Sequence, residues 1–141
     1  MKKEEYIIAT LHSHELKKTP ARVKVLQILE GSKYAVSYTQ LEAATKELAD
    51  RITLYRILKN FEQKGIIHKM TDHEGNAKYA LCVEGCNTHR HQDHHVHFNC
   101  TECNQTLCLE ETDIPKISLP RGYKAMQYAF TVNGLCRQCS K

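Results

Sequence analysis

Four cysteines have the residue type and the spacing of a metal site. They form two Cys-x-x-Cys pairs, Cys100 with Cys103 and Cys136 with Cys139, separated by 32 residues. A gap of two residues lets both thiolates of a pair reach one ion, and two pairs complete a tetrahedral sulfur shell with metal–sulfur bonds of roughly 2.3 Å. Zinc accepts thiolate ligands and has no redox chemistry. The sequence therefore predicts a structural zinc site, with four unrelated buried or redox cysteines as the alternative.

A second group of metal-binding side chains precedes the first pair. Alternate residues of a strand share a face, so His95 and His97 would point the same way on a strand, and we expect both to bind metal. His68 and Cys82, on a predicted hairpin, are candidates to complete that site, and Cys108 is a further candidate. The roles of four neighbouring residues stay open: Cys86, His89, His91 and His94. For His89 and His91 the favoured interpretation is a solvated linker that binds metal only loosely.

Charge and cysteine are unevenly distributed along the 141 residues. Residues 1–80 carry 14 Lys and Arg against 10 Asp and Glu, whereas residues 81–141 carry six of each. All seven cysteines follow residue 81. The sequence has neither an apolar run long enough to span a membrane nor a signal peptide, which predicts a cytoplasmic protein with no membrane partner. In that reducing compartment, cysteines favour metal or redox chemistry over disulfides.

Periodicity and capping signals predict helices in the basic part of the chain. Residues 3–16 look helical, and Thr19, Ser37 and Asp50 are suited to cap three further helices, with Pro20 at a first helical position. Gly65 is placed to end the last helix. Two faces are expected to be apolar, one made by Leu41, Ala44 and Leu48 and the other by Leu54, Leu58 and Phe61.

After Gly65 the period changes to that of strands. Residues 66–70 and 78–82 are expected to form a hairpin around a turn at residues 72–76, which completes a winged helix-turn-helix. Residues 83–94 suit a linker. Further strands are expected at residues 95–100, 106–109 and 123–132, and Pro115 and Pro120 limit any helix between residues 110 and 121 to a short one. The fold class predicted is α+β.

The last predicted helix of the basic part has the composition of a recognition helix. Arg51, Thr53, Tyr55 and Arg56 lie off its apolar face, where they would meet bases or phosphates in a major groove. Lys17, ahead of the Thr19 cap, would reach phosphate or the minor groove. The alternative is an ordinary solvated face.

Together these motifs resemble the ferric uptake regulator (Fur) family of bacterial metal-dependent repressors. Residues 19–22 look like its T-x-x-R start, which adds Arg22 to the DNA-contact candidates, and residues 53–58 look like its T-V-Y-R-x-L recognition helix. Residues 95–103 and 134–139 look like its metal-binding segments, in the same order. The resemblance implies a homodimer on double-stranded operator DNA, in which a sensor metal near the hinge sets the angle between the DNA-binding domains. It also implies a structural zinc on the four cysteines.

The expected organisation follows from that resemblance. Residues 1–82 would be the winged-helix DNA-binding domain, residues 83–94 the hinge, and residues 95–141 a small, zinc-stapled α/β dimerisation domain.

Departures from the family pattern favour zinc as the sensor metal. His68 and Cys82 match positions that zinc-sensing members, the zinc uptake regulators, use, and Cys108 stands where a Glu or Asp ligand is frequent. Soft thiolate favours zinc over ferrous iron. Asn104 replaces the glycine that usually follows the second cysteine. The sensor ligands expected are His68, Cys82, His95 and His97, with Cys108 as the alternative to one of them, and the ion expected is a second zinc rather than iron.

The function predicted is that of a zinc-responsive transcriptional repressor. An iron- or peroxide-responsive regulator of the same family is the nearest alternative, and a zinc-ribbon adaptor without DNA binding is the second. An enzyme acting on a small organic substrate is not predicted, because a four-cysteine site leaves no open position on the metal.

Overall fold

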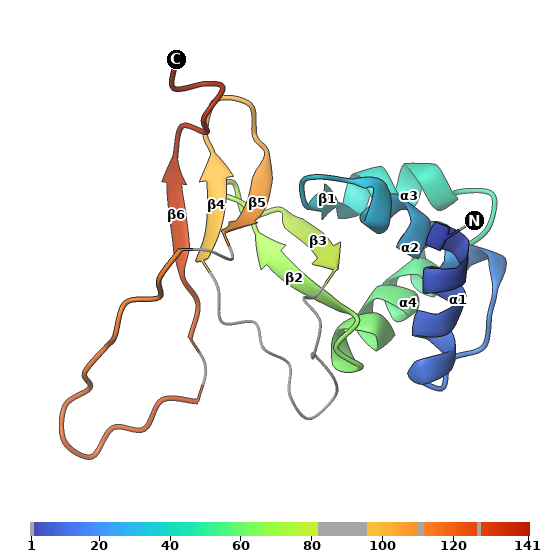
Figure 1. Ribbon diagram of the computed structural model, residues 1–141, viewed down its shortest axis with the longest axis horizontal. Coiled ribbons are helices and arrows are strands. Elements are labelled where there is room, and N and C mark those ends of the chain that lie inside the picture. The colour runs from blue at the N-terminus through green and yellow to red at the C-terminus, as the bar shows by residue number, and fades with distance from the viewer. Residues whose placement is uncertain (1, 82–95, 110–111, 127) are drawn as a thin grey trace.

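The computed structural model describes residues 2–81, 96–109, 112–126 and 128–141. Helices and a three-stranded sheet come first and a second three-stranded sheet follows, which confirms the α+β class (Figure 1). The described residues from 96 onward contain strands and no helix. The elements are α1 (Lys2–Ser13), α2 (Pro20–Gly31), β1 (Val36–Ser37), α3 (Tyr38–Thr45), α4 (Arg51–Gln63), β2 (Ile67–Thr71), β3 (Ala77–Leu81), β4 (Val96–Cys100), β5 (Thr106–Leu109) and β6 (Thr131–Gly134).

The predicted helix signals act as caps. The Thr19 hydroxyl accepts from the Arg22 amide at 3.3 Å, Ser37 and Gln40 form a reciprocal capping box, and Asp50 accepts from the Thr53 amide at 2.7 Å. These side chains satisfy amides that have no partner inside the helix. Gly65 follows α4 with a φ of 78°, a left-handed conformation that suits glycine.

The helices of residues 2–63 share one core with the first sheet. In α4 the predicted face is confirmed, since Leu54, Leu58 and Phe61 are buried. In α3 the predicted face is wrong: Leu41 is buried, but Ala44 and Leu48 are exposed. Within α3 the buried positions are Leu41 and Thr45, four residues apart, so Ala44 faces outward, and Leu48 lies beyond the end of the helix in the turn toward α4. None of the helices in the described part of the chain is both long and apolar enough to cross a membrane.

The first sheet has the order β1-β3-β2 and contains the predicted hairpin. β2 and β3 are antiparallel, with Lys69 opposite Tyr79, and the Asp72 carboxylate closes the turn by accepting from the amides of Glu74 and Asn76. In Figure 1 this hairpin lies between the helices and the second sheet. The hairpin is therefore placed between the helices and the second sheet, and just before β1 the Ala35 amide also donates to the Thr106 carbonyl of β5 at 2.7 Å.

The second sheet has the order β5-β4-β6, antiparallel between β4 and β5 and parallel between β4 and β6. A strand at residues 106–109 was correctly expected, but the strand expected at residues 123–132 is wrong over most of its length. Pairing begins only at Thr131, opposite His97, whereas Tyr123 and Met126 are 71% and 90% exposed. Alternating hydrophobicity indicated a strand there, but β4 offers partners to only a few residues.

Candidate metal sites and nucleic-acid face

The two cysteine pairs lie at the same end of the second sheet. Cys100 ends β4 and Cys103 lies in the turn after it, while Cys136 and Cys139 follow β6. The parallel pairing of β4 with β6 sets Cys100 opposite Gly134, and the Thr101 amide donates to the Gly134 carbonyl at 2.8 Å. The strand pairing therefore brings together two pairs that are far apart in sequence.

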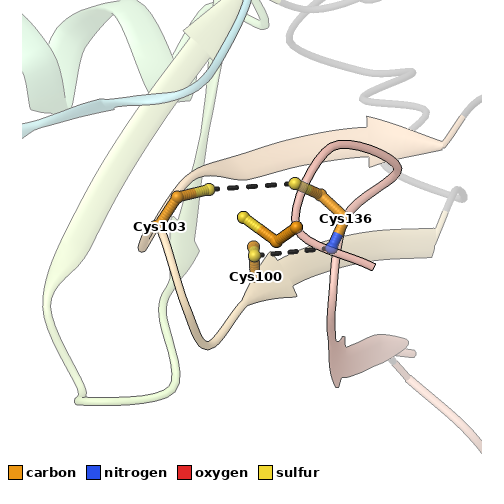
Figure 2. Close-up of side chains that lie close together, drawn as sticks. Cys100, Cys103 and Cys136 are labelled. Atoms are coloured by element: carbon orange, nitrogen blue, oxygen red, sulfur yellow. Dashed lines mark hydrogen bonds between the residues drawn. The ribbon is translucent and has the colours of Figure 1, made fainter. Parts of the chain in front are cut away.

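The four sulfur atoms have the spacing of a tetrahedral metal site. All four Sγ atoms lie within 4.8 Å of one another, and those of Cys103 and Cys136 are 3.9 Å apart (Figure 2). A tetrahedron with zinc–sulfur bonds of roughly 2.3 Å has edges of roughly 3.8 Å. This geometry and the all-thiolate donor set fit a structural zinc ion, which these four residues would hold.

Local hydrogen bonds shift the pKa values of these thiols in both directions. Backbone hydrogen bonds from Cys103 and Cys136 lower the pKa of Cys100 to about 6, and the Cys136 amide lies 3.4 Å from its sulfur. A side-chain hydrogen bond with Cys136 and the neighbouring thiols raise the pKa of Cys139 to about 12. Four thiolates cannot gather without a cation, so metal binding here would release protons.

A second cluster joins the two sheets. His68 on β2, His97 on β4 and Cys108 on β5 have ligand atoms within 4.8 Å of one another. His68 Nε2 lies 3.1 Å from Cys108 Sγ, and the two imidazole rings stack at 5.5 Å between centroids. His97 is paired directly with Cys108 across β4 and β5, so both side chains lie on one face. Two imidazoles and a thiolate are three of the four ligands that a tetrahedral zinc takes.

The structure places only part of the predicted sensor set. It brings the ligand atoms of His68, His97 and Cys108 within 4.8 Å of one another, and the roles of these three residues as sensor ligands stay predictions. Cys82 and His95 lie outside the described residues, and their ligand roles stay predictions. The same holds for the residues whose roles the sequence leaves open: Cys86, His89, His91 and His94. The proposed hinge, residues 83–94, also lies there, so the predicted domain boundaries stay predictions.

Four of the six predicted DNA-contact residues lie in the first half of α4. Arg51, Thr53, Tyr55 and Arg56 are exposed on that helix, opposite its buried face. The Arg51 guanidinium also pairs with Glu42 of α3 at 3.1 Å.

The two candidates that precede or begin α2 differ in exposure. Lys17 is exposed, whereas Arg22 is half-buried and donates to the Lys17 carbonyl at 2.8 Å. Arg22 therefore braces the loop that carries Lys17.

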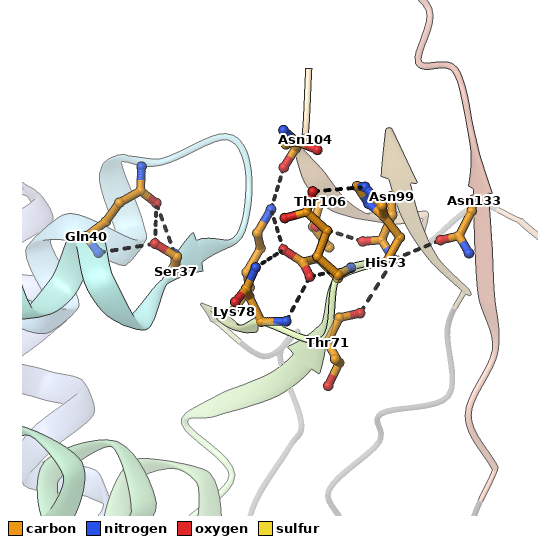
Figure 3. Close-up of polar contacts among 12 residues, drawn as sticks. Ser37, Gln40, Thr71, His73, Lys78, Asn99, Asn104, Thr106 and Asn133 are labelled. Carbon is orange, nitrogen blue, oxygen red and sulfur yellow. Dashed lines mark hydrogen bonds and ion pairs between the residues drawn. The ribbon is translucent and has the colours of Figure 1, made fainter. Parts of the chain in front are cut away.

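Sequence reasoning missed a buried polar network beside the cysteine site. Asn99 is buried; it donates to Asn133 at 3.1 Å and to the Thr71 carbonyl at 3.4 Å, and it accepts from Thr106 at 2.7 Å (Figure 3). The Lys78 ammonium donates to the Asn104 carbonyl. A lysine between small and aromatic residues in a predicted strand carries no signal of burial, because its partners come from another part of the chain.

Comparisons with known proteins agree with this architecture. The model of the ferric uptake regulator family matches residues 13–132. A ferric uptake regulation protein of Neisseria gonorrhoeae is 30% identical, over 94% of this chain and 92% of its own. Among solved structures, a zinc uptake regulator complexed with zinc and DNA aligns with a TM-score of 0.66 at 20% identity, over 99% of this chain and 96% of that chain. The ferric uptake regulator of Vibrio cholerae aligns with a TM-score of 0.57 at 20% identity, covering 91% and 98%.

Proposed function

Because this chain belongs to the ferric uptake regulator family, we propose that it is a zinc-responsive, DNA-binding transcriptional repressor that acts as a homodimer. The family assignment also makes it a regulator and not an enzyme.

The observation that carries this proposal is the cluster of His68, His97 and Cys108. Its three ligand atoms come from strands of both sheets and lie within 4.8 Å of one another. An ion bound by all three side chains would link β2 of the first sheet to β4 and β5 of the second. The thiolate of Cys108 is a soft ligand, and together with two imidazoles it favours zinc over ferrous iron. We therefore assign the sensor role to this cluster and the structural role to the four cysteines.

The cluster is connected to the DNA-binding helix by a short, rigid path. His68 lies on β2, which begins three residues after Lys64, the residue that caps α4. The Ile66 amide donates to the Phe61 carbonyl at 2.9 Å, and Ile66 and Phe61 are both buried. If ligand binding fixes β2 against the second sheet, it fixes α4 as well. A dimer samples conformations that differ in the spacing of its two α4 helices. Zinc binding would then raise the population of the conformation with one particular spacing.

The surface of α4 supports operator binding. Its exposed residues include Arg51, Tyr55 and Arg56, and the basic excess of the chain lies within residues 1–80. Such a helix fits the major groove, with arginine bound to base edges or phosphates. This face also counts against a zinc-ribbon adaptor without DNA binding, because such a protein does not need an exposed basic helix.

Exposed apolar side chains after residue 115 support the homodimer. Tyr123, Met126, Val132 and Leu135 are between 48% and 90% exposed, and β6 lies at an edge of its sheet. Several large apolar side chains left exposed in one part of a chain are typical of a surface that another protein covers. A second copy of the chain would cover it, and two α4 helices would then face two half-sites of a palindromic operator.

A metal titration of DNA binding tests the proposal. The probe is a labelled duplex selected from a random pool with zinc-loaded protein, and fluorescence anisotropy is the readout. Zinc is expected to raise the affinity on the order of 100-fold, the upper part of the usual range for such coupling. Ferrous iron, added without oxygen at the same free concentration, is expected to do much less.

A variant of the DNA-binding face serves as the control for that titration. Arg56→Ala should weaken DNA binding and leave zinc binding unchanged, since Arg56 lies on the exposed face of α4. Equal activation by iron would contradict the zinc assignment, and failure of the zinc-loaded protein to select any duplex would favour the adaptor.

A further inference from the structure

The tip of the β2–β3 hairpin is tied to the cysteine-bearing end of the second sheet. The Lys78 ammonium on β3 donates to the backbone carbonyl of Asn104, and it pairs with the Asp72 carboxylate at 3.8 Å (Figure 3). Asn104 directly follows Cys103, one of the four predicted zinc ligands. The contact therefore joins the DNA-binding part of the chain to the turn after β4 that carries Cys103.

This contact is buried and its partners are specific. The side chain of Lys78 is only 10% exposed and that of Asp72 only 7%. A lysine is rarely buried unless its charge has partners, because an unpaired ammonium loses its hydration. Burial alone would raise the pKa of Asp72, but hydrogen bonds from Asn76 and Glu74 and the charge of Lys78 outweigh it, so the pKa lies below its ordinary value. An ionised carboxylate at the hairpin turn thus faces Lys78.

The backbone of Asn104 is shaped to present its carbonyl. Its φ of 61° is left-handed, a conformation that asparagine tolerates better than most residues. The Asn104 amide donates back to the Cys100 carbonyl at 3.0 Å, which closes the turn that carries Cys103. The position of this carbonyl is therefore set by the same turn that brings Cys100 and Cys103 together.

A second bond holds the same end of the hairpin. The buried Asn99 amide group donates to the Thr71 carbonyl at the end of β2, three residues beyond His68. His68, near the start of β2, contacts Cys108 of β5. β2 is therefore fixed at one end by polar bonds and at the other by the metal-binding cluster, and its orientation sets where the His68 imidazole lies.

We propose that Lys78, held between Asp72 and the Asn104 carbonyl, is a positioning residue that docks the β2–β3 hairpin on the turn that carries Cys103 and so preorganises His68 for sensor zinc. This rests on the sensor role proposed above. The four-cysteine site then does more than stabilise the second sheet, because the turn that carries Cys103 and Asn104 also positions the hairpin of the sensor site. A ligand held in place before the metal arrives binds with less loss of conformational entropy.

Zinc affinity of the full chain, measured by competition with a chromophoric chelator and without DNA, tests the proposal. Lys78→Met keeps the length of the side chain and suits a buried site, but it removes the charge and the donor. The sensor site of this variant is expected to bind zinc about 10-fold more weakly, the lower end of the loss caused by removing groups that orient metal ligands. The four-cysteine site should keep its zinc, and Lys78→Arg should restore most of the sensor affinity.

Matched variants separate positioning from other roles. Lys69→Met, on the exposed face of β2, should leave zinc affinity unchanged. Asn99→Ala should lower the affinity of the sensor site in the same direction as Lys78→Met, and it provides the test if Lys78→Met does not fold. The salt dependence of DNA binding should keep its slope in Lys78→Met, since a buried lysine does not contact phosphate.

Two results would overturn the proposal. One is wild-type sensor affinity in folded Lys78→Met and in Asn99→Ala. The other is unchanged zinc affinity with a salt slope reduced by about one, which would make Lys78 a phosphate contact. Failure of the wild-type protein to bind DNA would leave these zinc measurements intact, so the two proposals fail separately.

Discussion

Replacing His97 with alanine is expected to weaken zinc binding at the sensor cluster by at least about 100-fold, since losses of 10- to 100-fold already follow when only the groups around metal ligands are removed. His97 lies opposite Cys108 in the β4–β5 pairing and stacks on His68, so its removal leaves two of the three described ligands. The zinc concentration that half-activates DNA binding should rise by the same factor. Fluorescence anisotropy with zinc buffered by a chelator measures it.

The matched control removes a histidine that has no place in the cluster. His12 is exposed on α1, and His12→Ala should keep the wild-type half-activation point. His97→Ala should still purify with one zinc per chain, held by the four cysteines. If His97→Ala is activated at the wild-type zinc concentration, the cluster is not the sensor.

Loss of the four-cysteine site should destabilise the fold, an effect that is not expected of His97→Ala. Cys136→Ser removes one thiolate of the tetrahedron, and metal binding at such a site is part of the folding free energy. Beyond residue 95, the described chain has a single three-stranded sheet whose buried hydrophobic residues are Val96 and Cys100, so it has little apolar core of its own. We expect the melting temperature to fall on the order of 10 °C or more, and the dimer to be lost. Differential scanning calorimetry and light scattering measure the two effects.

The control for this variant lies on the same turn. Arg137, between Cys136 and Cys139, is exposed, and Arg137→Gln should melt and dimerise as the wild type does. The helical circular dichroism of Cys136→Ser should largely survive, because the core that α1 to α4 share with the first sheet contains no residue beyond residue 81. A Cys136→Ser protein that retains the wild-type melting temperature would show that the four cysteines do not hold the sheet together.

Local signals in the sequence were sufficient for the first half of the fold. The caps at Thr19, Ser37 and Asp50 act within four residues, and the buried face of α4 repeats with the helical period, so both are readable without tertiary contacts. The face of α3 was mispredicted for two reasons: the buried partner of Leu41 is the polar residue Thr45 instead of Ala44, and Leu48 lies past the end of the helix. A helix end is set by the turn that follows, which the apolar pattern does not record.

The two metal clusters differ in how far spacing could predict them. Within each Cys-x-x-Cys pair the spacing fixes the geometry, and the parallel pairing of β4 with β6 completes it. The cluster proposed as the sensor depends on three strands from two sheets, so its membership needs the register: His97 lies opposite Cys108, and His68 reaches them from β2. Lys78 was invisible for the same reason, since its partner is a backbone carbonyl 26 residues away. Every residue has a backbone carbonyl, so the sequence does not indicate which one accepts a hydrogen bond from a lysine.

The most direct test of the sensor assignment is an anomalous difference map, recorded at the zinc absorption edge on crystals of the zinc-loaded protein. Two peaks per chain are expected, one among Cys100, Cys103, Cys136 and Cys139 and one bonded to His68, His97 and Cys108. A single peak at the four cysteines, with zinc-activated DNA binding retained in solution, would contradict the assignment and place the sensor elsewhere in the chain.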